Sequence, residues 1–231
     1  MLLPDTALFG VFYFPGMDTI VGIGDSWMEG NGASAYKRSM LPILAAATNT
    51  FALNHGIGSS TMQNGIPVNP IGGVNLMARL HNIPVKRSTV KMLIFEFGLN
   101  DMGYNGGNYD TAAYKAAYRS ALDTAIARGW PAECILMLAP GYTTDAGYDF
   151  YATLSGNPAP DLSRHKAYIA ACYHLSLEYP GVQFVHLYDS MMLHGAAALM
   201  SDDGLHPNDA GHAYIAAVLT PLVGVSEVGE R

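Results

Sequence analysis

Short apolar runs alternate with longer segments of helical pattern along most of this chain, and this alternation limits the fold more than any other feature. The short runs are predicted to be strands at 19–24, 51–54, 92–97, 135–139 and 184–187. The longer segments are predicted to be helices at 33–47, 74–81, 111–128, 163–179 and 209–222. Such alternation is typical of a parallel sheet with helices on both faces, so the sequence predicts an α/β fold.

Four segments fall outside this pattern. Residues 140–161 and 102–109 are rich in turn residues and show neither period, so we expect loops there. Residues 1–18 are expected to form an N-terminal extension, whose aromatic cluster at 9–14 is a candidate for self-association, and 224–231 a short C-terminal tail. The remaining residues, 19–223, are predicted to form one domain, which a chain of 231 residues favours.

The charge and hydropathy pattern excludes several partners. Twelve Lys and Arg against 19 Asp and Glu give a formal net charge of −7, which opposes binding to nucleic acid or to an anionic membrane surface. No apolar run approaches the roughly 20 residues of a membrane span. The first residues lack the basic region and cleavage site of a signal peptide. A cytoplasmic location and an extracellular one within a larger assembly therefore both stay open.

Polar residues gather directly after the first three predicted strands and again before the last helix. These blocks lie at 24–26, 54–60, 98–101 and 203–207. The carboxyl ends of parallel strands meet at one edge of a sheet, which is where open α/β sheets bind ligands. We therefore expect the blocks to lie together and to form the functional site.

The residue types in these blocks suit nucleophilic catalysis. Ser26 is a candidate nucleophile because a serine at a strand-to-helix turn can present its hydroxyl at the sheet edge. The spacing of Asp203 and His206 lets the carboxylate fix the imidazole tautomer and leaves Nε2 as a general base. Asn100 and the glycine-rich turn after Asn54 offer donors to an oxyanion. Taken singly, each block has a structural interpretation as well: an N-cap, a surface loop or an Asx turn.

Other chemistry is less favoured. The histidines near the C-terminus match no zinc or calcium spacing, and the paired glycines lack the remainder of a nucleotide-binding loop, so neither metal nor cofactor is predicted. Cys134 and Cys172 each lie in an apolar segment and are interpreted as buried unpaired thiols. Asp25 and Glu29, beside Ser26, are interpreted as groups that stabilise its turn.

The four blocks resemble the conserved blocks of the SGNH hydrolases, also called GDSL esterases. The resemblance rests on GDSWMEG at 24–30, on NHGIGSST at 54–61, on GLND at 98–101 and on Asp203-x-x-His206-Pro207, in the family's order. The resemblance implies that residues 19–223 form an SGNH hydrolase domain. It implies a three-layer α/β/α sandwich with a central, mostly parallel sheet, the flavodoxin-like SGNH hydrolase fold. It also implies ester hydrolysis through an acyl-enzyme, with no metal or cofactor.

The resemblance also implies a role for each site residue. Ser26 is then the nucleophile, His206 the general base and Asp203 the residue that orients it. The implied oxyanion-hole donors are the N–H of Ser26, the side chain of Asn100 and a backbone N–H of Ser59 or Gly58. The family usually has glycine where Ser59 stands.

The predicted substrate is a small-molecule or polysaccharide ester, with short-chain acetyl esters of a carbohydrate preferred. Trp27, which stands where the family commonly has an aliphatic residue, is expected to line the site, and Tyr104 and Tyr142 are expected to contact the substrate. Further tyrosines of the two loops, at 109, 148 and 151, offer flat faces for sugar rings, unless they only pack their own loops. The alternatives are a lysophospholipase or thioesterase of the same family, and an SGNH-like binding module of a larger surface or viral tail assembly.

Overall fold

A five-stranded parallel sheet forms the centre of the computed structural model, which describes residues 18–64, 66, 75–104, 110–156 and 158–223. The strands are β1 (Thr19–Gly24), β2 (Phe51–Gly56), β3 (Val90–Glu96), β4 (Ile135–Leu138) and β5 (Gln183–Val185). Their order across the sheet is β2-β1-β3-β4-β5. This is the flavodoxin-like order, in which ligands bind beyond the carboxyl ends of the strands beside β1 and β3.

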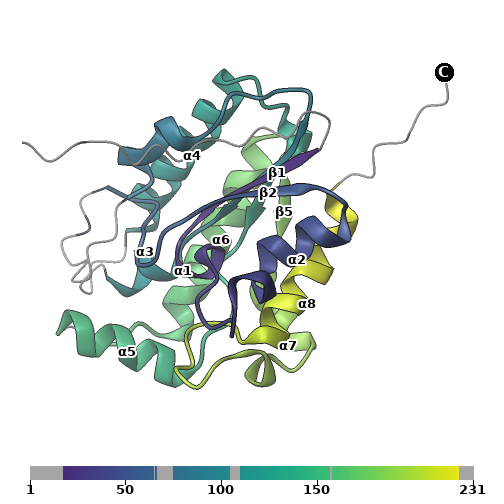
Figure 1. Ribbon diagram of the computed structural model, residues 1–231. Coiled ribbons are helices and arrows are strands. Elements are labelled where there is room, and N and C mark those ends of the chain that lie inside the picture. Colours follow the sequence, from purple (N-terminus) through teal and green to yellow (C-terminus); the bar gives the residue numbers. More distant parts are fainter. Residues whose placement is uncertain (1–17, 65, 67–74, 105–109, 157, 224–231) are drawn as a thin grey trace, which may run out of the picture.

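Helices cover both faces of the sheet. They are α1 (Ser26–Glu29), α2 (Met40–Ala47), α3 (Leu99–Gly103), α4 (Thr111–Ala127), α5 (Asp145–Ser155), α6 (Leu162–Glu178), α7 (Leu187–Leu193) and α8 (Asp209–Leu219). Short 3-10 turns are η1 (Tyr36–Arg38), η2 (Met77–Asn82), η3 (Ala132–Cys134), η4 (Ala196–Leu199) and η5 (Thr220–Leu222). Helices α2 and α8 pack together on one side and α4 and α6 on the other (Figure 1). The predicted three-layer α/β/α sandwich is therefore confirmed.

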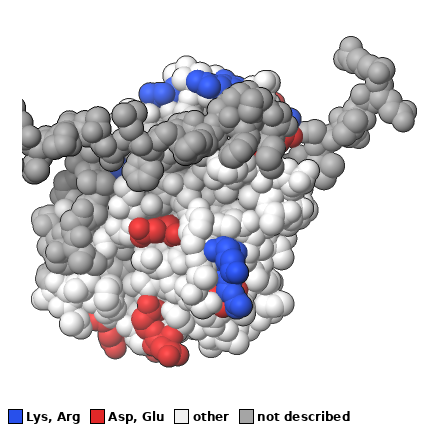
Figure 2. Space-filling view, in the orientation of Figure 1, with Lys and Arg blue, Asp and Glu red and all other residues white. Residues whose placement is uncertain are grey.

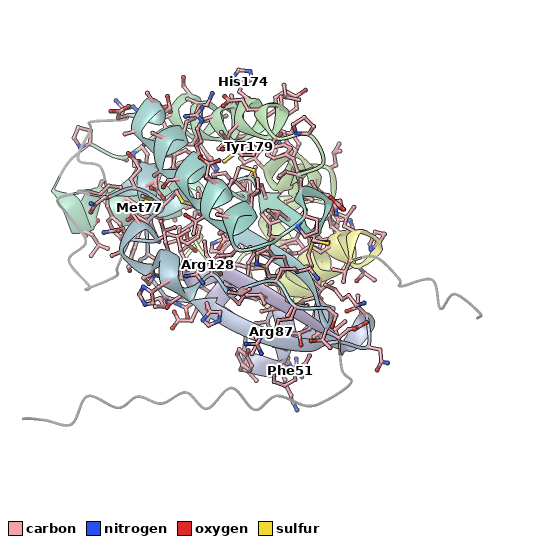
Figure 3. All side chains as sticks on the ribbon, turned by 90° about the horizontal axis from the view of Figure 1, so that it is seen from above. Phe51, Met77, Arg87, Arg128, His174 and Tyr179 are labelled. Atoms are coloured by element: carbon pink, nitrogen blue, oxygen red, sulfur yellow. The ribbon has the colours of Figure 1, made fainter. Side chains whose placement is uncertain are left out.

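Figure 3 shows the molecule from above, turned by 90° from the view of Figure 1. Phe51, at the start of the edge strand β2, and Tyr179, directly after α6, lie on opposite sides of the molecule in this view. The three inner strands β1, β3 and β4 are almost entirely buried; in β4 all four residues are buried. Continuous apolar strands of this kind are expected where helices cover both faces of a parallel sheet.

Side-chain caps set the beginnings of the long helices. Asp110, Thr144, Asp161 and Asn208 stand before α4, α5, α6 and α8, and each accepts a hydrogen bond from the backbone N–H three residues later. A cap of this kind satisfies one of the backbone donors that a helix leaves unpaired in its first turn. The bounds of the predicted helices at 111–128 and 163–179 agree with α4 and α6 to within one residue.

The predicted helix at 33–47 is wrong in its first half. Helix α2 begins at Met40, and Ser39 before it has extended backbone, with φ −80° and ψ 160°. Pro42 explains the difference, because a proline has no N–H to donate inside a helix but is tolerated in a first turn. In α2 it occupies that first turn, whereas in a helix from residue 33 it would lie in the interior.

The predicted loop at 140–161 is wrong in its middle, where helix α5 lies. Thr144 caps the start of α5 through a hydrogen bond to Gly147 N–H, and Gly156 ends it with φ +66°. Both residue types are typical of loops, but here they are the two ends of a helix. The predicted strand at 184–187 also differs, because β5 ends at Val185 and α7 begins at Leu187.

Some predictions concern residues that the structure does not describe. The aromatic cluster at 9–14, the tail at 224–231 and Tyr109 lie outside the described residues. In the part of the chain that is described, no helix is long and apolar enough to cross a membrane.

Candidate active site

The turn that carries Ser26 lies directly on the edge of the sheet. Ser26 is the first residue of α1 and follows β1 after the single residue Asp25, whose side chain accepts a hydrogen bond of 3.0 Å from Trp27 N–H. Gly30 ends the helix with φ +105°. Asp25 therefore stabilises the turn as an N-cap, which agrees with its interpretation from the sequence.

A chain of hydrogen bonds joins Ser26, His206 and Asp203. Nε2 of His206 lies 2.9 Å from Oγ of Ser26, and Nδ1 of His206 lies 2.6 Å from Oδ2 of Asp203. Oδ1 of Asp203 accepts the backbone N–H groups of Leu205 and His206, at 2.8 and 2.9 Å. The carboxylate thus holds both the ring and the backbone of His206.

The electrostatics of Asp203 follow from these contacts. Partial burial raises its pKa, but the hydrogen bonds from the His206 side chain and from the His206 and Leu205 backbone outweigh burial and bring the pKa to about 2. Asp203 is therefore ionised at neutral pH, and a proton on Nδ1 of His206 would point at it, which leaves the lone pair of Nε2 facing Ser26.

Trp27 is buried and supports the site from within. It is 1% exposed, and its indole N–H donates to Leu205 O at 2.9 Å. The expected role of Trp27 in lining the site is therefore not supported by its position. Its hydrogen bond ties the segment before His206 to the helix that begins with Ser26.

The third block brings Asn100 into the same region through α3. Its amide Nδ2 donates to Ser60 O at 2.9 Å, and its Oδ1 accepts from the Tyr151 hydroxyl at 2.9 Å. The amide orientation is thereby fixed from both ends, since Tyr151 can donate only to an oxygen. Tyr151 comes from α5, and no sequence pattern predicts this contact, because a loop is expected in its segment.

The second block lies beside Ser26 as well. A Cβ added at Gly58 would be 3.9 Å from Cβ of Ser26, so this backbone runs close to the nucleophile candidate. Gly58 N–H donates to Oε2 of Glu29 at 2.8 Å, and Ser59 has φ +59°, in the left-handed region where glycine is favoured. Glu29 therefore holds the turn of the second block through Gly58, whereas the sequence interpretation places its effect on the turn of Ser26.

The tyrosines expected to face a sugar are mostly buried. Tyr104 is 1% exposed, and its hydroxyl lies 3.2 Å from Oγ of Ser59. Tyr148 and Tyr151 are buried too, and Tyr142 is half-buried with its ring centroid 5.7 Å from that of Tyr188. The Tyr104 ring lies against Tyr151 of α5, with centroids 5.2 Å apart, and the Tyr148 ring lies beside His165 of α6. These rings therefore pack between neighbouring segments, and the burial of Tyr104 does not support its expected contact with a substrate.

Two more carboxyl groups lie buried beneath the site. Burial raises the pKa of Asp25 to about 7, against the hydrogen bond from Trp27 N–H, which lowers it. Burial likewise raises the pKa of Asp101 to about 6, although Met62 and Gln63 donate their backbone N–H groups to its carboxylate at 2.9 and 2.8 Å. Among the described residues no group of three His, Cys, Asp or Glu side chains is arranged to hold a metal ion.

The comparisons with known proteins agree with this architecture. The sequence model of the GDSL-like lipase/acylhydrolase family matches residues 23–214. Because that match covers most of the chain, the protein belongs to this family and is an ester hydrolase. No curated protein sequence gives a significant match.

Several solved structures share the fold. A lipase/acylhydrolase from Enterococcus faecalis is 18% identical, with a TM-score of 0.64 over 89% of this chain and 94% of that one. A protein from Lactobacillus plantarum is 25% identical, with a TM-score of 0.65 over 90% and 96%. A carbohydrate acetylesterase family member from Sinorhizobium meliloti is 16% identical, with a TM-score of 0.65 over 90% and 97%.

The raised pKa values predict that Asp25 and Asp101 stabilise the fold at mildly acidic pH and lose this effect as pH rises. Between about pH 4 and pH 7 the unfolded chain releases protons that both groups keep in the folded state, so their contribution to the free energy of unfolding falls through this window by about 2 kcal/mol or more. Buried His165, whose pKa burial lowers to about 4, contributes with the opposite sign. Urea denaturation at about pH 5 and pH 8 measures the difference.

The matched variant for this prediction is Asp101→Asn, whose amide oxygen still accepts from a backbone N–H but does not titrate. Between pH 5 and pH 8 this variant should lose less stability than the wild type, or gain more, because it lacks the contribution of Asp101 while that of His165 is the same in both proteins. Asp203 does not obscure the result, because its lowered pKa of about 2 affects stability only in stronger acid. An equal change in the free energy of unfolding for both proteins between the two pH values would contradict the prediction.

Proposed function

We propose that Ser26 attacks the acyl carbonyl of an ester, with His206 as general base and Asp203 as the group that orients it. The supporting observation is the hydrogen-bonded chain of 2.9 and 2.6 Å that joins the three side chains across 180 residues of sequence. His206 takes the Ser26 proton as the C–O bond forms, and gives it to the leaving alcohol. Water then attacks the acyl-enzyme by the same route and releases the acid, which restores Ser26.

The oxyanion donors proposed here are Ser26 N–H, the Asn100 amide and Ser59 N–H. Gly58 N–H, the other candidate of the second block, donates to the Glu29 carboxylate at 2.8 Å. Asn100 Nδ2 carries two hydrogens, and Ser60 O accepts one of them. The second hydrogen is the one that this proposal assigns to the developing oxyanion. The catalytic domain in this proposal is 19–223.

The proposed substrate is a neutral short-chain ester, preferably an acetyl ester of a carbohydrate. The face seen in Figure 2 carries Asp and Glu side chains at its centre and lower part, and its central basic side chain lies against acidic atoms. Glu29, one helical turn from Ser26, and Asp202 are exposed, while Arg38 is paired with Asp209 at 2.7 Å. Anionic substrates such as acidic lysophospholipids or acyl-coenzyme A would be repelled there. The similarity to a carbohydrate acetylesterase family member gives further support.

Replacing the nucleophile tests the proposal. Ser26→Ala should lower kcat for p-nitrophenyl acetate by about 10⁴-fold or more, because no other hydroxyl stands at this position, while the melting temperature stays near that of the wild type. Ser163→Ala, at an exposed position of α6, is the matched control and should be fully active.

A fluorophosphonate probe separates an enzyme from a binding module. Wild type should be labelled at Ser26 in one-to-one ratio, as read by peptide mass spectrometry, and Ser26→Ala should not be labelled. Unlabelled wild type would favour the binding module, and undiminished turnover of Ser26→Ala would place the nucleophile elsewhere.

The oxyanion proposal predicts a graded effect at Asn100. Asn100→Ala should lower kcat by about 10²- to 10³-fold with little change in KM, since the donor acts on charge that develops in the transition state. Tyr151→Phe keeps the amide but removes the hydroxyl that fixes its orientation, so a smaller loss of about tenfold is expected. Equal decreases in kcat for the two variants, or an increase in KM without a decrease in kcat, would argue against an oxyanion donor.

The substrate proposal predicts discrimination by charge. With the same acetyl group, phenyl acetate should have a higher kcat/KM than 4-acetoxybenzoate, and added salt should narrow the difference. Glu29→Gln keeps an acceptor for Gly58 N–H, and it should also narrow the difference in kcat/KM between the two acetates. Acetate release from acetylated xylan should exceed fatty acid release from an acidic lysophospholipid. The reverse preference would favour the lysophospholipase or thioesterase alternative.

A further inference from the structure

Two buried carboxyl groups meet directly beneath the turn that carries Ser26. Asp25 and Glu96 are each 1% exposed, and Asp25 N–H donates to Oε2 of Glu96 at 3.4 Å. Parallel pairing of β1 with β3 places Gly24 opposite Glu96. A Cβ added at Gly24 would lie 2.9 Å from Oε2 of Glu96, so glycine at this position lets the carboxyl group reach the turn.

The pair holds the backbone on both sides of Ser26. Glu96 accepts from the N–H of Asp25, and Oδ1 of Asp25 accepts from the N–H of Trp27. The orientation of the Ser26 N–H and hydroxyl therefore depends on where these two carboxyl groups lie. Neither group lies in the Ser26–His206–Asp203 chain, and the reaction steps proposed above use neither.

The pair lacks donors for two ionised carboxylates. Oδ2 of Asp25 and Oε1 of Glu96 have no hydrogen-bond donor within the described part of the chain. An ionised carboxylate only accepts hydrogen bonds, so two of them side by side would repel and leave these oxygens unsatisfied. A proton on Glu96 would turn one carboxyl group into a donor to the other and would remove the repulsion between two carboxylates.

The surrounding charges balance one carboxylate but not two. The other titratable groups facing the pair or its nearest cation are Arg79 from η2, His55 from β2, Asp101 and Tyr104 from α3 and its end, Tyr118 from α4 and Tyr151 from α5. Arg79 is the cation, 5% exposed, and it donates to His55 O at 3.2 Å. Burial and Arg79 lower the pKa of His55, so His55 stays neutral.

We propose that Glu96 is a positioning residue whose carboxyl group keeps one proton, shared with Asp25, and that this protonated pair holds the turn of Ser26 in the geometry needed for attack. The proposal rests on the proposed role of Ser26 as nucleophile. Its chemical consequence is a second ionisation in the pH profile, separate from that of the general base.

The sign of this pH effect follows from burial. Burial, and next to it the charge of Asp25, raise the pKa of Glu96 well above its ordinary range. Between the pKa of Asp25, about 7, and that of Glu96 the pair carries one negative charge, which Arg79 balances. Above the pKa of Glu96 the proton goes to solvent, two adjacent carboxylates repel, and the turn loosens. Activity therefore falls on the alkaline side.

The test compares Glu96→Gln with Glu96→Leu and with the wild type. Gln keeps a permanent N–H donor to Asp25 and does not titrate, whereas Leu removes donor and acceptor. The readout is kcat and KM for p-nitrophenyl acetate from about pH 6 to about pH 10, corrected for spontaneous hydrolysis. Glu133→Gln, at an exposed position far along the chain from the site, is the control for loss of a carboxylate.

The wild type should lose activity at the alkaline end, by about tenfold for each pH unit above the upper pKa of the pair. Glu96→Gln should keep kcat near neutral pH and lose this decline. Glu96→Leu should lower kcat by about tenfold or more at every pH with KM nearly unchanged. Infrared spectra at neutral pH should show a protonated carboxyl band in the wild type and in Glu133→Gln that Glu96→Gln lacks.

The outcomes separate this proposal from the one on which it rests. Absence of fluorophosphonate labelling at Ser26 in the wild type would overturn the proposed function. Labelling at Ser26 together with an alkaline decline that persists in Glu96→Gln, or a wild-type spectrum without the carboxyl band, would overturn the shared proton alone. If Glu96→Leu does not fold, the pH profile of Glu96→Gln and the infrared band still test the shared proton.

Discussion

The parallel register of β2, β1 and β3 is the constraint on which the site depends. Gly24 pairs with Gly56 on one side and with Glu96 on the other, so the three segments that follow leave the sheet side by side. A Cβ on Gly56 would lie 2.2 Å from the backbone N of Glu29. Glycine at the ends of β1 and β2 lets α1 lie directly on the sheet, and so brings the backbone of the second block close to Ser26.

The remaining site residues come from outside the sheet and need separate support. The segment with Asp203 and His206 is tied to α1 by the Trp27 indole, and an antiparallel bridge joins Met200 to Pro207 around it. Catalytic geometry of this kind requires side chains to be held by packing and by further hydrogen bonds. The buried Trp27 supplies that support here, although it has the bulk of a substrate-lining residue.

The strands and helices that depend on a local sequence pattern could be predicted from the sequence. The elements and contacts that depend on tertiary structure could not. Residues 19–24 form β1 as predicted because an apolar run ending in glycine is a strong local signal. Helix α5 was missed because its caps, Thr144 and Gly156, are also loop residues. The four blocks could be placed at one sheet edge from the order of strands and helices.

Contacts between distant side chains were harder to predict. The hydrogen bond from Tyr151 to Asn100 joins two residues 51 positions apart, and no local sequence pattern predicts this contact. The buried position of Tyr104 was likewise hidden, because an aromatic residue in a turn-rich segment suits either a ligand surface or a core. Glu96 lies in the clearest predicted strand, yet only the register of that strand against β1 places its carboxyl group under Ser26.

The central claim is that the strand ends hold Ser26 and its oxyanion donors around one point. The most direct measurement is a crystal structure of the wild type after reaction with a fluorophosphonate. We expect phosphorus bonded to Ser26 Oγ and the phosphoryl oxygen about 2.7–3.1 Å from Ser26 N, Ser59 N and Asn100 Nδ2, with Gly58 N still bonded to Glu29. An adduct on another residue, or a phosphoryl oxygen that points to solvent away from these donors, would contradict the account.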